Sequence, residues 1–169
     1  MLFGKSGACG GCWCMWWRLK NSEYQKNQGT GNKKKMLKLV KRKNPIGILA
    51  YLKNIPIGWC SVSPRKNLVR LETSRVLTKV DEKEVWSINC FFIKKEFRNK
   101  KITNDLIVQA IKFAKKHGAK ILEAYPLDVK RKDYPQVFAF TGFKNPFIKN
   151  GFTEVARRTK NKPILRREI

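Results

Sequence analysis

The stretch of sequence that decides the fold is "NCFFIKKEFRNKKITNDLIVQAIKFAKKHGAKILEAYP", residues 89–126. It opens in an aromatic and β-branched run, which is typical of a buried strand. A basic turn follows, and from Thr103 apolar residues recur at helical spacing as far as a stop signal at Gly118. The next apolar run, from Ala119, predicts another strand. The stretch is therefore a strand–helix–strand unit with positive charge at its first junction.

Further strands are expected on both sides of this unit. Two short β-rich runs before it indicate one hairpin, and two runs at the end of the chain indicate another. A helix is expected over residues 33–44, where Pro45 ends it. The expected strands cover residues 46–52, 57–64, 85–93, 119–128, 153–159 and 163–169. This order predicts a mixed α/β sheet in one domain, residues 1–169, with residues 1–35 as a Cys- and Trp-rich entry segment packed on it.

The composition is strongly basic. The 169 residues include 38 Lys and Arg against 12 Asp and Glu, a formal charge of +26. That charge favours anionic partners such as nucleic acid or a phosphate-rich cofactor, although compositional drift toward Lys, Ile and Asn explains it equally well. The sequence shows neither an apolar stretch near the ~20 residues of a membrane span nor a signal-peptide pattern. With five cysteines, an odd number, we expect reduced thiols and a cytoplasmic location.

The basic turn has a chemistry of its own. The first N–H groups of a helix have no intrahelical partner, and the dipole makes this end positive. Arg98, Lys100 and Lys101 directly precede the predicted helix. Such an end binds phosphate, and basic side chains strengthen the attraction. A solvated basic helix start is the alternative interpretation of this segment alone.

The order of elements resembles that of the GNAT superfamily of acetyl-CoA-dependent N-acetyltransferases. The resemblance covers residues 36–167, and it is close to a bacterial subgroup with an N-terminal "CWCM.WR" stretch. The motifs that carry it stand in this sequence at residues 12–18, 58–65, 85–98, 114–128 and 147–158. The resemblance implies a GNAT fold: a mostly antiparallel central sheet with a splayed parallel strand pair and flanking helices.

The resemblance also implies acetyl-CoA as the cofactor. In the family the pantetheine arm lies along the end of the central strand, and the diphosphate lies on a turn with the pattern Arg/Gln-x-x-Gly-x-Gly/Ala. Arg98 fits that pattern, but Lys101 and Thr103 replace its two small residues. A lysine there could help hold the diphosphate, although a turn that needs φ > 0 would cost about 1 kcal/mol or more. The implied cofactor-binding residues are Cys90, Phe92, Ile93, Arg98, Asn99, Lys100, Lys101, Ile102 and Thr103.

Acetyl transfer needs acid–base groups. Many members of the family have a Tyr four residues before a late Gly-Phe, and this chain has Phe147 there. Tyr125, in the predicted strand at residues 119–128, is the candidate proton donor. Glu123 is two residues earlier on the same face and could relay a proton from the amine. A half-buried tyrosine and a salt-bridged glutamate are the structural alternatives.

The acceptor is expected to bind near the N-terminal segment. The resemblance implies that the aromatic and basic residues of this segment line the acceptor pocket. It also implies that Glu72 lies in a loop where substrates enter. The candidate acceptor residues are Trp13, Trp16, Trp17, Arg18 and Glu72. Cys9, Cys12 and Cys14 have a spacing that can bind zinc. The fourth ligand would have to come from Cys60, Cys90 or His117, and the sequence has no second C-x-x-C pair. We therefore expect no metal. Packing under the sheet is the alternative for these residues.

Together these features predict an N-acetyltransferase. We expect acetyl to pass directly to a primary amine of a small molecule or a protein, because no Cys-His or Ser-His pairing suggests an acyl-enzyme. The alternative is a basic nucleic-acid-binding module on a degenerate acetyltransferase fold. No membrane partner is expected.

Overall fold

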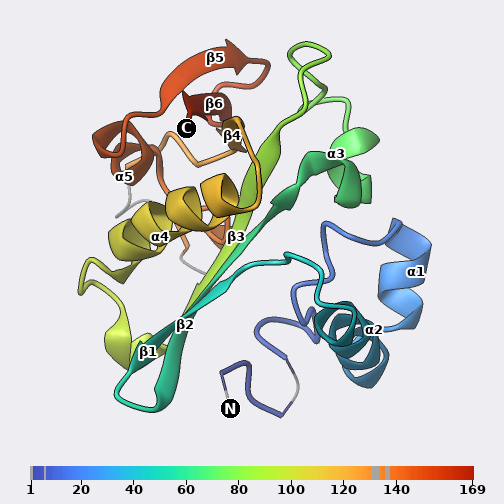
Figure 1. Cartoon of the computed structure of the whole chain (residues 1–169). Helices are drawn as coiled ribbons and strands as arrows, with labels where there is room; N and C mark the ends of the chain where they lie inside the picture. The colour runs from blue at the N-terminus through green and yellow to red at the C-terminus, as the bar shows by residue number, and fades with distance from the viewer. Residues whose placement is uncertain (1, 6, 131–133, 136–137) are drawn as a thin grey trace.

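The computed structural model describes residues 2–5, 7–130, 134–135 and 138–169, which include a six-stranded sheet (Figure 1). Its strands lie in the order β1-β2-β3-β4-β6-β5, and the β3–β4 pair is parallel while the other pairs are antiparallel. The strands are β1 (Ile48–Leu52), β2 (Ile55–Pro64), β3 (Trp86–Ile93), β4 (Ile121–Ala124), β5 (Thr153–Arg157) and β6 (Pro163–Glu168). The predicted mixed α/β sheet is confirmed.

The parallel pair is short, and its two strands part early. Three residue pairs join them, the last being Ile88 with Ala124, after which β4 ends and β3 runs on to Ile93. Beyond the parting, a loop residue approaches β3, and the carbonyl of Phe140 accepts a hydrogen bond from the amide of Phe91 at 2.6 Å. The predicted splayed pair is therefore present.

A β-bulge in β3 lies at the same point. Ser61 of β2 pairs with Cys90, and the next residue of β2 pairs with Ile88. Asn89, which lies between them in β3, therefore has no partner residue in β2. The extra residue resets the alternation of side chains along the strand. As a result, Phe91 belongs to the core on one face of the sheet, whereas Cys90 and Phe92 pack in a cluster on the other.

Helix α4 (Ile102–Lys116) closes the first of these two cores. It starts one residue before the predicted position, and Gly118 follows its end with φ of +83°. Its apolar stripe is buried against β1, β2 and β3 and consists of Leu106, Ile107, Ala110, Ile111 and Ala114. The predicted amphipathic helix is confirmed.

The N-terminal segment packs on the opposite side of β2 and β3 from α4 (Figure 1). Its buried residues, among them Met15, Tyr24 and Met36, cluster with Trp59 of β2 and contact Phe92 of β3. The predicted helix here, α2, begins three residues earlier than expected. The remaining helical elements are α1 (Asn21–Lys26), α2 (Thr30–Lys41), η1 (Arg65–Asn67), α3 (Val69–Glu72), η2 (Lys95–Phe97) and α5 (Lys144–Lys149).

Candidate active site

A cavity of about 1070 Å³ lies beside the free end of β3. Four parts of the chain line it: the N-terminal segment with α1, Trp59 of β2 with the end of β3, the turn before α4, and the stretch from residue 138 into α5. The cavity therefore borders the place where β3 leaves β4. Splaying opens a gap in the sheet, and the N-terminal segment walls it on the side away from α4.

The basic turn presents a helix start to this cavity. Asn99 and Lys101 have φ values of 64° and 62°, and Lys101 is the N-cap of α4 without a side-chain capping bond. The first helical hydrogen bonds run from Asn104 and Asp105 to the Lys101 carbonyl. In the described part of the chain, the amides of Ile102 and Thr103 have no acceptor, and both residues line the cavity. A phosphate group could accept hydrogen bonds from them.

The left-handed conformation of Lys101 has a measurable cost. Replacing Lys101 with glycine removes the contact between its Cβ and the following carbonyl, at the expense of a more flexible unfolded chain. We expect Lys101→Gly to raise the free energy of unfolding by about 0.5 kcal/mol in urea titrations. Lys100→Gly is the matched control, because Lys100 has no positive φ and should lose stability. Destabilisation of both variants would contradict this prediction.

Most of the predicted cofactor residues meet at the cavity. All of them except Lys100 line it, including Cys90, Phe92 and Ile93 from the end of β3. Lys100 instead places its ammonium over the ring of Phe97, 5.5 Å from the centroid. The Arg98 guanidinium is anchored by a 3.0 Å hydrogen bond from Nε to the Ile93 carbonyl.

The predicted acceptor residues divide into two groups. Trp16 and Trp17 line the cavity, and the indole N–H of Trp17 is buried without a hydrogen-bond partner among the described residues. Trp13, Arg18 and Glu72 do not line it. The N-terminal turn directs the ring of Trp13 toward Phe3, the Arg18 guanidinium bonds to the carbonyl of Ile46, and Glu72 pairs with Arg65.

Several residues of this wall were not predicted from the sequence. Phe3 and Trp59 pack together over Phe92, with ring centroids of Phe3 and Phe92 5.5 Å apart. Tyr24 and Gln25 of α1 complete the side nearest Trp16. In the sequence, only the aromatic residues indicate a buried surface, because a polar segment such as "NSEYQK" does not predict a cavity wall.

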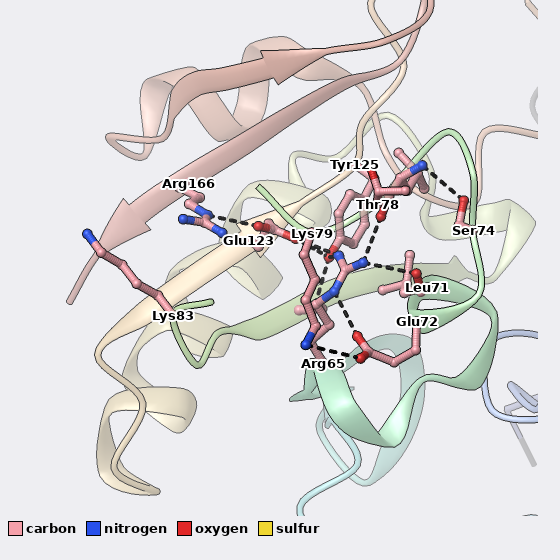
Figure 2. Close-up of polar contacts among 12 residues, drawn as sticks. Arg65, Leu71, Glu72, Ser74, Thr78, Lys79, Lys83, Glu123, Tyr125 and Arg166 are labelled. Atoms are coloured by element: carbon pink, nitrogen blue, oxygen red, sulfur yellow. Dashed lines mark hydrogen bonds and ion pairs between the residues drawn. The ribbon is translucent and has the colours of Figure 1, made fainter. Parts of the chain in front are cut away.

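Tyr125 and Glu123 meet in a buried polar network (Figure 2). The Tyr125 hydroxyl donates to Glu123 Oε1 at 2.6 Å, and Arg65 Nη1 donates to both groups at 2.8 Å. Arg166 Nε holds the other oxygen of Glu123 at 2.8 Å, and Ser87 Oγ lies 2.9 Å from the Tyr125 hydroxyl. Burial, followed by the charge of Glu123, raises the pKa of Tyr125 well above its ordinary value. The hydroxyl is therefore protonated at neutral pH.

Neither Tyr125 nor Glu123 lines the cavity. Tyr125 packs in one cluster with Trp17, Cys90 and Phe140, which do line it. The pair thus lies one layer behind the cavity wall, and its role in proton transfer stays a prediction.

Phe147 occupies the place where the family usually has a tyrosine. It is fully buried in the core, edge-on to Phe91 at 6.0 Å and to Phe152 at 5.3 Å. A phenyl ring has no proton to give, so acid catalysis from this position is excluded.

The cysteines are free thiols, and four of them line the cavity: Cys9, Cys12, Cys14 and Cys90. Among the described residues, no three His, Cys, Asp or Glu side chains are placed to hold a metal ion. The described helices likewise contain none long and apolar enough to cross a membrane.

The fold agrees with that of known acetyltransferase structures. A ribosomal-protein-alanine N-acetyltransferase from Brucella melitensis superposes with a TM-score of 0.53 at 13% identity, covering 82% of this chain and 77% of that one. The PaiA N-acetyltransferase from Thermoplasma acidophilum, in complex with coenzyme A, gives 0.50 at 17% identity over 94% and 87% of the two chains.

The sequence comparisons define the family. The profile of the acetyltransferase (GNAT) family matches residues 13–136, so the chain belongs to that family. An uncharacterized N-acetyltransferase from Methanocaldococcus jannaschii is 28% identical over 82 residues. That match covers 48% of this chain and 36% of the length of the relative.

Proposed function

We propose that the protein transfers an acetyl group from acetyl-CoA to a primary amine by direct attack of the amine on the thioester. The observation that carries the proposal is the cavity at the free end of β3, with the uncapped start of α4 at its edge. Membership of the GNAT family supports the reaction, and the coenzyme A complex of the Thermoplasma relative supports the cofactor.

The residues present fit such a cofactor. The amides of Ile102 and Thr103 and the guanidinium of Arg98 would hold the diphosphate, because donors at a positive helix end match its charge. β2 pairs with one edge of β3 as far as Ile93, and the opposite edge faces the gap left by β4. Phe92 and Ile93 would lie along the pantetheine arm there. Bound acetyl-CoA supplies the acyl group as a thioester.

The aromatic wall fits an amine acceptor. Trp16 and Tyr24 meet edge to face at 5.1 Å, and the Arg70 guanidinium stacks 3.7 Å from the ring of Trp16. Because Arg70 already lies over Trp16, the wall offers an amine an apolar surface that excludes water, which favours the neutral amine that attacks. The unpartnered indole N–H of Trp17 could donate a hydrogen bond to a carbonyl oxygen of either substrate.

Proton transfer to the leaving thiolate is proposed to start from Tyr125, with Glu123 as its partner. If so, Tyr125→Phe should lower kcat by about 100-fold at saturating substrates. The lost hydrogen bonds should reduce the free energy of unfolding by about 1 kcal/mol. Ser87→Ala is the control, because it removes a neighbouring hydroxyl of the same network without removing the phenol. An unchanged kcat in folded Tyr125→Phe protein would show that Tyr125 has only a structural role.

The test of the proposed function combines binding and turnover. Calorimetry should detect acetyl-CoA binding, and a thiol-reactive dye should report free coenzyme A when a panel of polyamines, aminoglycosides, amino acids and peptides is added. Failure of both experiments on folded protein would refute the proposal.

Nucleic acid stays a predicted second partner. The 12 acidic residues are too few to neutralise the 38 Lys and Arg, even where they form ion pairs such as Glu154 with Arg157 and Asp128 with Lys144. Binding to RNA or DNA that weakens steeply with salt would support this partner.

A further inference from the structure

Arg18 is a buried cation without a carboxylate. The residue is 8% exposed, and its guanidinium donates to the carbonyl of Ile46 at 3.1 Å and to Ser63 Oγ at 3.2 Å, both neutral groups. Among the residues that the structure describes, no Asp or Glu forms an ion pair with it. A buried charge is costly unless an opposite charge lies close by, so the surroundings of Arg18 should contain an anion.

A cysteine can supply the anion. Cys14 interacts electrostatically with Arg18, and its sulfur accepts a 3.0 Å hydrogen bond from the indole N–H of Trp59. Cys90 packs against the same cluster as Cys14 and interacts electrostatically with it. Trp13 and Cys14 both have positive φ, 44° and 58°, a strained conformation that is common at functional sites. Three donors or charges therefore converge on one sulfur.

We propose that Cys14 and Cys90 form a dithiol site for a small hydroperoxide, with Cys14 as the attacking thiolate and Cys90 as the resolving thiol. The geometry carries this assignment. Trp59 bonds to Cys14, Ser61 two residues further along β2 pairs with Cys90, and Cys90 packs against the cluster that contains Cys14. Both cysteines line the cavity through which a small oxidant can enter.

The protonation states suit the two roles. The hydrogen bond from Cys90, followed by the charge of Arg18 and the donors Trp59 and Ser61, lowers the pKa of the Cys14 thiol to about 6 against the effect of burial. The pKa of Cys90 is raised well above its ordinary value, first by the same hydrogen bond and then by burial. Cys12 and Cys60 are the other thiols that face the pair. One sulfur is thus ionised at neutral pH and its neighbour keeps its proton.

The reaction balances with the hydroperoxide as the only oxidant. The Cys14 thiolate attacks the terminal peroxide oxygen, the O–O bond breaks, and with one proton the products are a sulfenic acid and an alcohol, or water from hydrogen peroxide. The Cys90 sulfur then attacks the Cys14 sulfur and expels the oxygen as water. The two thiols lose two electrons and the peroxide gains them, and a dithiol reductant reverses the change.

The consequence for acetyl transfer rests on the proposed function. Cys90 lies two residues before Phe92, where the cofactor arm is proposed to pass, so a disulfide here changes the wall of the cofactor cavity. Oxidation should lower transfer at least 10-fold, and dithiothreitol should restore it.

Mass spectrometry tests the site without acetyl-CoA. The reduced full chain receives one equivalent of hydrogen peroxide, is blocked with an alkylating agent in denaturant and is mapped by peptide. We expect a Cys14–Cys90 disulfide in the wild type and in the matched control Cys9→Ser. In Cys90→Ser we expect a sulfenic acid at Cys14 that dimedone traps. Oxidation at Cys9 or Cys12 with Cys14 still reduced would overturn the proposal.

The pH profile of alkylation is a second test that does not depend on the disulfide. Iodoacetamide should modify Cys14 with a midpoint near pH 6, and Trp59→Phe and Arg18→Met should move that midpoint upward. Trp59→Phe still decides the question if Arg18→Met does not fold. A midpoint of about 8.5, the ordinary thiol value, would overturn the proposal. Because acetyl-CoA binding to reduced protein is measured separately, the thiol site and the proposed function can fail independently.

Discussion

Arg65→Ala is expected to lower the free energy of unfolding by about 3 to 5 kcal/mol, since it removes one partner of a buried ion pair. The guanidinium donates to Glu123 and Tyr125, and its second terminal nitrogen donates to the carbonyls of Leu71 and Leu77 at 2.9 and 2.7 Å (Figure 2). Alanine would leave a buried carboxylate with one cation fewer and two carbonyls unpaired. The loop that follows β2 would lose its attachment to β4.

Urea denaturation followed by tryptophan fluorescence measures this loss. Lys66→Ala is the matched control, because the neighbouring Lys66 forms an ion pair with Glu84 in which the side chains are 70% and 87% exposed. Exposed pairs contribute little, so the midpoint of the control should not move. Equal midpoints for the two variants would show that the buried network is not needed for stability.

Thr103→Glu is expected to weaken acetyl-CoA binding by about 100-fold, or ~2.7 kcal/mol, because a carboxylate would stand where the diphosphate is proposed to bind. The same carboxylate lies in the first turn of α4 and favours the helix dipole. The fold should therefore be kept while the cofactor is lost. Calorimetry on the folded variant gives the affinity directly.

The control for this variant adds the same charge to the same helix. Gln109→Glu is on the exposed face of α4, away from its start. It should bind acetyl-CoA nearly as the wild type does. If Thr103→Glu also binds normally, the diphosphate does not rest on the start of α4.

The sequence predicted the sheet and α4 well because their patterns are local. The apolar stripe of α4 and the aromatic run of β3 are each contained in a single short segment. The bulge at Asn89 was not predicted, since an extra residue in a ladder depends on the register of the partner strand β2. The splayed pair came from the family resemblance and not from the residues themselves.

Long-range polar contacts could not be predicted. Arg65 is separated from Glu123 by 58 residues in the chain, and nothing near either residue indicates the other. Arg18 was expected at the acceptor because of the family resemblance of the N-terminal stretch, whereas the structure buries it beside Cys14. Two consecutive residues with left-handed backbone, Trp13 and Cys14, turn the chain there, and neither is a glycine, so the sequence does not predict the turn at these positions.

The two faces of β3 belong to separate apolar clusters. The start of α4, where the diphosphate is proposed to bind, is continuous with the α4 core, whereas Phe92, which is proposed to lie along the cofactor arm, packs in the N-terminal cluster. Substitutions of Trp16 and Tyr24 would therefore alter the proposed acceptor wall while the α4 core stays intact, whereas a substitution of Phe3 would also disturb Phe92. If the proposed function holds, selection could change acceptor preference at Trp16 and Tyr24 while the start of α4 stays constant.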